Sequence, residues 1–254
     1  GDQGGASEDA IRALQADDLP LPLVRDAVRL VASDRVKDIA ATKAVSSLDI
    51  GECIWLAGEL DRSPREARIA VGILEPVADL DFGSDPGGWE AVRSELAAKY
   101  IGMGACDEAA QLLGLGGREV GDMDVRDAFN YAMAAWGATS EVVLGPFSRV
   151  VELDQNNPES GQQDPNPNYY QCMAIAYWAS GDTNMAARFV ELARAAVEPV
   201  KWEIWSGSLF SCWRYYRPSS SEFLEDLDEI EALINGDASR KPRFMTAAAE
   251  SSSE

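Results

Sequence analysis

Apolar residues recur at helical spacing along most of the chain, from about residue 20 to residue 235. Positions three and four residues apart share one face of an α-helix, so this spacing predicts amphipathic helices that pack on one another. The strict alternation that marks a β-strand is not sustained between turn residues. The sequence therefore predicts an all-α fold. The expected helices cover residues 20–33, 34–47, 49–61, 63–79, 88–103, 105–115, 124–138, 140–153, 167–180, 182–198, 201–216 and 219–235.

Residues that start and stop helices stand at the edges of these segments. Ser63 begins the sequence Ser-Pro-Arg-Glu, which combines a capping hydroxyl, a proline in the first turn and a glutamate three residues after the cap. Asp49, Asp124 and Ser219 are each followed three residues later by an acidic residue, as is typical of a helix start. Gly236 can adopt the left-handed conformation that closes a helix. The helix edges thus agree with the apolar pattern.

Two segments that stand 77 residues apart share one spacing of tyrosine, glycine and alanine. They read LAAKYIGMGACDEAAQLL and MAIAYWASGDTNMAARFVELA, and YAMAAWGATSEVVLGPFSRVVELDQNNP fills a further unit between them. The spacing resembles the signature of the tetratricopeptide-repeat (TPR) superfamily, over roughly residues 49–235. The matched positions are Leu96, Ala97, Tyr100, Gly104, Ala109 and Leu113, and then Met173, Ala174, Tyr177, Gly181, Ala186, Val190 and Ala193.

The resemblance implies stacked antiparallel helix hairpins, about six pairs, that form a TPR-like right-handed α-solenoid. Small residues at the matched alanines would let the helices of a pair approach closely. We expect one repeat domain over residues 19–236, a flexible or short-helical lead over 1–18 and a disordered tail over 237–254. The last hairpin would cap the array, because its first helix carries an aromatic stripe from Trp202 to Tyr216 that is typical of a buried face.

Catalytic chemistry finds little support among the residue types present. The chain has no histidine, which excludes Ser-His-Asp and Cys-His arrangements and the HExxH zinc site. Its four cysteines contain no CxxC pair, and three of them stand in apolar helical patterns, so we expect buried thiols rather than disulfides or metal ligands. We therefore predict no catalytic, cofactor-binding or metal-binding residue, and no enzyme.

The chain is strongly acidic, with 43 acidic against 22 basic residues and a formal net charge of −21. Phosphate backbones and anionic lipid surfaces attract the opposite sign, so nucleic-acid and membrane-surface roles are disfavoured. No segment approaches the roughly 18 consecutive apolar residues that a membrane span needs. We expect a cytoplasmic protein whose partner is a protein or peptide, and a basic partner would complement the charge. The oligomeric state does not follow from the sequence.

In the TPR superfamily the first helix of each pair usually lines a concave groove. Carried onto this chain, the resemblance places Gln171, Ile175 and Trp178 on that face, with Phe129 and Trp136 nearby. The alternative for the tryptophans is that they fill space between repeats, because buried aromatics commonly serve packing.

The resulting hypothesis is a non-enzymatic scaffold or adaptor that binds a protein or peptide in this groove. Two alternatives remain open. The chain could be the regulatory repeat region of a larger enzyme or transcription factor. It could also be an α-helical small-ligand-binding or hydrolytic protein that uses carboxylates in an aromatic cleft.

Overall fold

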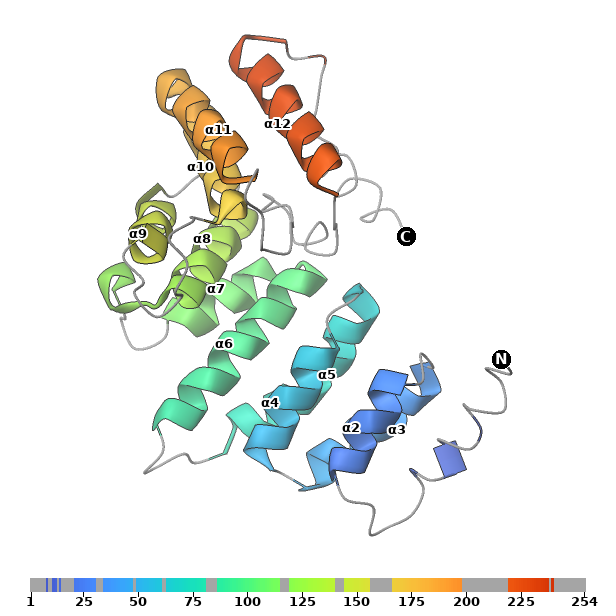
Figure 1. Cartoon of the computed structure of the whole chain (residues 1–254). Helices are drawn as coiled ribbons and strands as arrows, with labels where there is room; N and C mark the ends of the chain where they lie inside the picture. The colour runs from blue at the N-terminus through green and yellow to red at the C-terminus, as the bar shows by residue number, and fades with distance from the viewer. Residues whose placement is uncertain are drawn as a thin grey trace. The chain divides into compact units, whose positions relative to one another are not determined.

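The computed structural model shows an all-helical chain. It describes residues 8, 11–12, 14, 21–30, 34–47, 49–60, 63–80, 86–114, 119–139, 144–155, 166–197, 219–237 and 239. These residues form eleven α-helices and one 3-10 turn, and none of them is in a strand (Figure 1). The all-α prediction is therefore confirmed for this part of the chain. The helices fall into two compact units, Gly1–Met103 and Gly104–Glu254.

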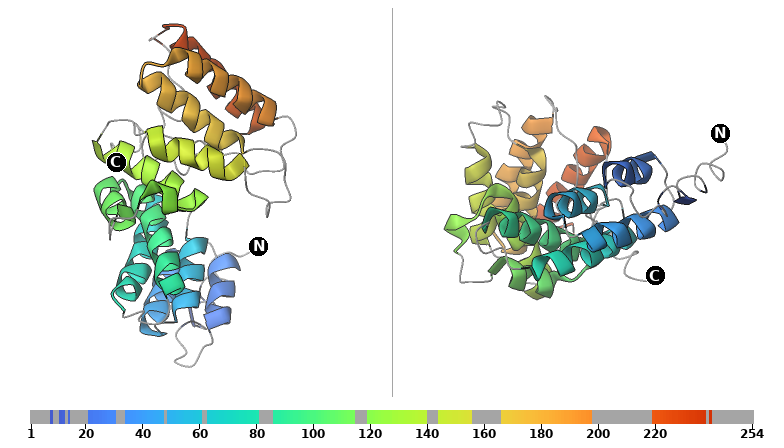
Figure 2. Two further views of the ribbon diagram at one scale, coloured as in Figure 1. Left: turned by 90° about the vertical axis from the view of Figure 1, so that its left-hand side faces the viewer. Right: turned by 90° about the horizontal axis from the view of Figure 1, so that it is seen from below.

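The first unit contains five helices that follow one another along the chain. They are α2 (Leu21–Leu30), α3 (Asp34–Ser47), α4 (Ile50–Glu59), α5 (Pro64–Ala78) and α6 (Pro86–Met103). Consecutive helices of the unit pack against each other, and α5 also contacts α3 (Figures 1 and 2). From the lead segment the structure describes four residues in helical conformation, among them the fully buried Leu14.

Local sequence signals set the edges of α4 and α5. The Asp49 carboxylate accepts a hydrogen bond of 2.9 Å from the main-chain N–H of Glu52. The Ser63 hydroxyl accepts one of 3.2 Å from the N–H of Glu66. Each bond satisfies a first-turn amide that the helix itself leaves unpaired. Both predicted helix starts are confirmed, and Glu66 also forms a buried ion pair with Lys37, which connects α5 to α3.

The second unit contains six helices and the 3-10 turn. They are α7 (Cys106–Gly114), the turn Val120–Asp122, α8 (Val125–Thr139), α9 (Leu144–Gln155), α10 (Pro167–Ala179), α11 (Thr183–Val197) and α12 (Ser220–Ile234). Helix α8 packs on α7 and α9, while α10 packs on α9, α11 and α12 (Figure 1). The predicted helix over 201–216, with its aromatic stripe, and nearly all of the predicted tail lie outside the described residues.

The two segments that share the tyrosine–glycine–alanine spacing also share local conformation. Gly104 follows α6 and Gly181 follows α10, and both have φ of 87°. Glycine adopts this left-handed conformation without the steric penalty of other residues, and it is the usual way for a helix to end. The alanines at the matched positions are fully buried, as the close approach of helices requires. They are Ala97, Ala109, Ala174, Ala186 and Ala193.

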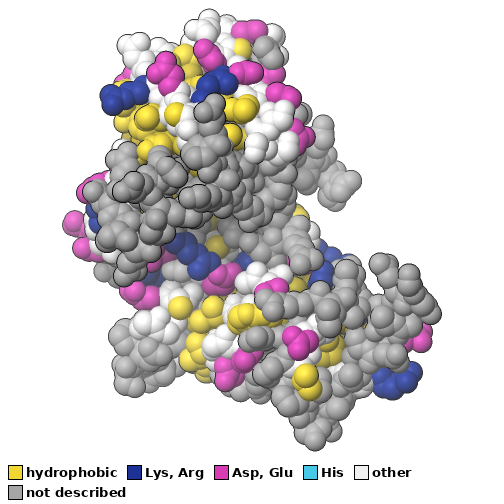
Figure 3. All heavy atoms as spheres, in the orientation of Figure 1, with side chains coloured by type: hydrophobic (Ala, Val, Ile, Leu, Met, Phe, Trp, Pro, Cys, Tyr) yellow, Lys and Arg dark blue, Asp and Glu magenta, His cyan; other side chains and the backbone are white. Residues whose placement is uncertain are grey.

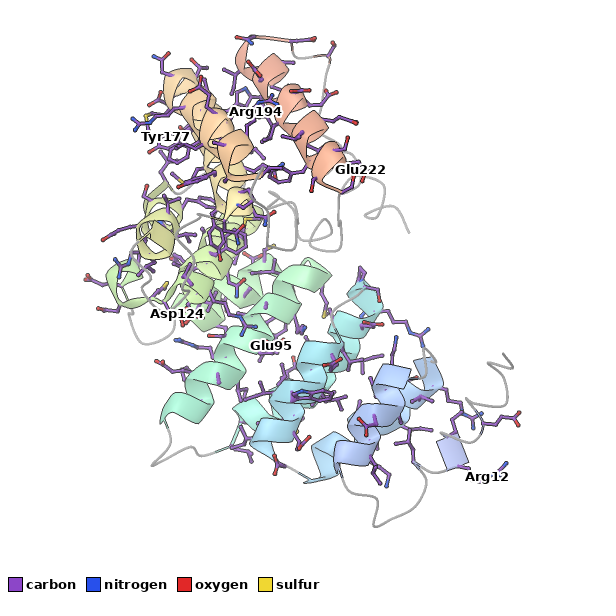
Figure 4. All side chains as sticks on the ribbon, in the orientation of Figure 1. Arg12, Glu95, Asp124, Tyr177, Arg194 and Glu222 are labelled. Atoms are coloured by element: carbon purple, nitrogen blue, oxygen red, sulfur yellow. The ribbon has the colours of Figure 1, made fainter. Side chains whose placement is uncertain are left out.

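Helix α12 closes the described part of the second unit. It begins with a capping box in which the Ser219 hydroxyl and the Glu222 carboxylate each bond the other residue's main-chain N–H (Figure 4). Its buried face is made of Phe223, Leu227 and other apolar residues at helical spacing, and it packs against α11. On its outer side, Arg194 of α11 pairs with carboxylates of α12.

Two helices begin at residues that the apolar pattern alone did not identify. Helix α6 begins at Pro86 rather than at 88, and proline is favoured at the first helical position because no partner is needed for its missing N–H. Helix α9 is described from Leu144, whereas the pattern suggested a start at 140. A start at Leu144 places Pro146 in the first turn, where it is tolerated; a start at 140 would place it inside the helix.

Candidate functional site

Buried polar side chains gather on particular helices. Nine of the eleven buried polar or charged side chains among the described residues belong to α6, α8 and α10, counting the residue that caps α10. These helices are the first members of three of the predicted pairs. The nine are Arg93, Ser94, Glu95, Lys99, Asp127, Asn130, Asn166, Asn168 and Gln171. Because buried polar groups cost free energy unless they are paired, this distribution marks the first helices as the place to look for function.

Helix α10 presents two different faces. Tyr170 and Tyr177 lie one above the other and pack on Phe189 of α11, with ring centroids 5.9 and 5.5 Å away (Figure 4). Each residue turns a helix by about 100°, so Gln171, Ile175 and Trp178 form a separate stripe on another face. We call these three residues the α10 stripe. It runs from Gln171, 0 % exposed, through Ile175, 2 % exposed, to the partly exposed Trp178.

The carboxamide of Gln171 is the unusual feature of this stripe. Neither its Nε2 nor its Oε1 has a hydrogen-bond partner in the part of the chain that the structure describes. A carboxamide can donate two hydrogen bonds and accept two. A buried polar group left unpaired costs about 1–3 kcal/mol, so Gln171 reduces the stability of the fold rather than supporting it.

Another buried amide on the same helix behaves differently. Asn168 is also 0 % exposed, but its Nδ2 donates to the Oδ1 of Asn166 at 2.8 Å. That oxygen, which caps α10, also accepts the main-chain N–H of Asn168 at 3.0 Å. Asn166 and Asn168 therefore serve the start of the helix, whereas Gln171 has no such structural role.

The two candidates on α8 have different surroundings. Trp136 is 6 % exposed and meets Phe147 of α9 edge-on, with centroids 5.7 Å apart, so it fills space between helices. Phe129 is partly exposed and its ring lies 5.5 Å from that of Tyr169, which connects α8 to α10. The sequence did not identify Asn130, which is 4 % exposed and whose Nδ2 has no partner among the described residues.

A charged group on α6 was also missed at the sequence level. Lys99 is 0 % exposed and its Nζ lies 3.0 Å from the Glu95 carboxylate (Figure 4). Arg93, 2 % exposed, lies over the ring of Trp89 at 5.1 Å from its centroid. The spacing of Glu95 and Lys99, four residues apart, is a helical ion-pair signal, but it is usually found on exposed surfaces. Burial of this pair could not be read from that signal.

The described cysteines have the environment of structural residues. Cys53, Cys106 and Cys172 are buried and free. Burial, and then the neighbouring carboxylates of Asp49 and Glu52, raise the pKa of Cys53 to about 11. Burial also raises the pKa of Cys172 well above its ordinary value. A thiol held in its protonated form is a poor nucleophile and a poor metal ligand. Among the described residues, no group of three or more acidic or cysteine side chains is arranged to hold a metal ion.

The surface agrees with the acidic composition. Acidic side chains are spread over the described surface on the face shown in Figure 3, with basic side chains among them. No helix within the described ranges is long and apolar enough to cross a lipid bilayer.

We compared the chain with protein-family models, with curated proteins and with solved structures, and no match was found in any of the three comparisons. Function is therefore inferred from the chain's own residues.

Proposed function

We propose that this chain is a non-enzymatic scaffold or adaptor of stacked TPR-like helix pairs, which binds a protein or peptide on the face of its first helices. The observation that carries the proposal is the buried, unpaired carboxamide of Gln171 within the α10 stripe. The concentration of other buried polar residues on α6, α8 and α10 supports it.

A binding role explains why such a residue would be kept. Folding alone favours an apolar side chain of the same size at position 171, because that would remove two unpaired polar atoms. Sites that bind partners commonly sacrifice stability for function. The stripe also joins an amide, an aliphatic side chain and an indole, which are the group types that give orientation and contact area in binding sites.

The charge of the chain suggests the character of the partner. A net charge of −21 attracts basic proteins over distances comparable to the Debye length, about 8 Å at physiological salt. Long-range attraction raises association rates more than it raises final affinity. We therefore propose a basic protein whose association with this chain slows as salt is added. The three free, buried thiols support a reducing, cytoplasmic setting.

Affinity capture of partners tests the proposal. The native chain is compared with Trp178→Ala, which removes the exposed end of the α10 stripe, and with Arg188→Ala, a control at an exposed position on α11. We expect a specific protein to be retained by the native chain and by the control but lost from Trp178→Ala. Both variants should remain helical by circular dichroism. Equal loss from the two variants, or no specific protein on the native chain, would contradict the proposal.

A further inference from the structure

We infer that the α10 stripe recognises an extended peptide segment through a main-chain amide of that segment, with Gln171 as the pairing residue. This inference rests on the proposed function and gives the chemistry of the group that is bound. It follows from the geometry of one side chain, whose donor and acceptor are both buried and both without a partner among the described residues.

The missing partner must satisfy a donor and an acceptor that stand side by side. A carboxylate or phosphate could accept from the Nε2 of Gln171 but would repel its Oε1. An ammonium or guanidinium group could donate to Oε1 but has no acceptor for Nε2. A peptide group offers an N–H and a C=O, so a main-chain segment can satisfy both atoms without burying a charge. The neutral amide at position 171 therefore selects against charged groups at this point.

The length of the stripe fits a short extended segment. Gln171 and Trp178 are seven residues apart, which corresponds to about 10 Å along a helix axis. An extended chain advances by about 3.3 Å per residue, so about three peptide residues would span the stripe. The main chain would pair with Gln171 at the buried end, and side chains of the peptide would contact Ile175 and the partly exposed Trp178. The basic groups of the partner would then lie outside the stripe.

A second amide on the neighbouring first helix is consistent with this chemistry. Asn130 of α8 is buried and its Nδ2 is also unpaired within the described residues. Asn130 needs an acceptor, and main-chain carbonyls are the acceptors that every peptide carries. Two helices of the same unit thus each hold a buried neutral amide donor in need of a partner.

The test uses a library of displayed linear peptides selected on the full chain. Peptides that lose affinity for Trp178→Ala are kept, because these are the ones bound at the α10 stripe. Their affinities are then measured for Gln171→Met, which has nearly the same size and lacks both polar atoms. In parallel, each main-chain amide of a selected peptide is replaced in turn by an ester, which removes one N–H donor and leaves the protein unchanged.

We expect Gln171→Met to weaken binding by about tenfold or more, and the ester at one position to weaken binding by about three- to tenfold. If affinity is unchanged by Gln171→Met and by every ester, the inference is wrong, although the stripe still binds peptides and the proposed function stands. If no selected peptide responds to Trp178→Ala, the proposed function fails and this inference fails with it. The ester series decides the matter even where Gln171→Met does not fold.

Discussion

Replacing Gln171 by methionine should stabilise the protein. The side chain is 0 % exposed, and its two polar atoms have no partner in the described part of the chain, so the folded state carries the desolvation cost of both. Methionine has a similar volume and can adapt to the space through its flexible thioether. Allowing for imperfect packing, we expect a gain of about 1–3 kcal/mol in the free energy of unfolding. For a unit of this size the melting temperature should rise by roughly 3 to 9 °C, measured by circular dichroism.

Asn168→Leu is the matched control on the same helix. Asn168 is equally buried, but its amide donates to Asn166, so this substitution removes a made hydrogen bond. We expect Asn168→Leu to lower the free energy of unfolding by about 1–2 kcal/mol. Opposite signs for the two variants would show that the pairing of the amide, rather than its burial, decides the effect. A loss of stability in Gln171→Met as large as in the control would refute the reasoning, because it would mean that Gln171 is paired in the folded protein.

Three further predictions concern stability and thiol reactivity. Cys53, whose pKa is raised to about 11, should have little thiolate at pH 8 and react with iodoacetamide about a hundredfold more slowly in the native protein than in denaturant, as followed by mass spectrometry. Gly181→Ala should cost about 1 kcal/mol because φ is +87°, whereas Gly72→Ala within α5 should add about 0.5–1 kcal/mol; neither new methyl group meets an atom within 4 Å, so equal effects in thermal melts would contradict this reasoning. Ser219→Ala should weaken α12 by about 1 kcal/mol and speed exchange of its amide hydrogens, while Ser220→Ala, one residue into the helix, should leave exchange nearly unchanged.

Local features of the fold could be predicted because their causes lie within a few residues of each other. Ser63 and Ser219 each bond an amide three residues later, so the sequence contains both partners. Gly104 and Gly181 stand at the ends of their helices in the same conformation, as their shared spacing suggested. The early start of α6 was missed because Pro86 was read as part of a loop, although proline also favours the first helical position.

The candidate site was predicted less completely because burial and pairing depend on residues far away in the chain. The repeat spacing selected Trp136 and Trp178 by the same reasoning. Trp136 proved to be packed against Phe147 of the next helix, whereas Trp178 keeps exposed surface. Nothing in the sequence around either tryptophan distinguishes them, since the difference arises from the helix that lies against each one. Asn130 was missed for a related reason, because the register of the middle unit was uncertain by one or two residues.

Gln171 shows how the two levels of reasoning depend on each other. Spacing placed it on the stripe of α10, yet spacing could not show that its amide would be buried without a partner. The structure shows the unpaired amide but, without the spacing, it would be one unsatisfied group among several. Asn168, three residues earlier, separates the two meanings of a buried amide, because its bond to Asn166 explains it without any ligand. A residue that weakens the fold and lies on the face where binding is expected calls for an external partner, and a neutral amide specifies that this partner should bring a peptide group rather than a charge.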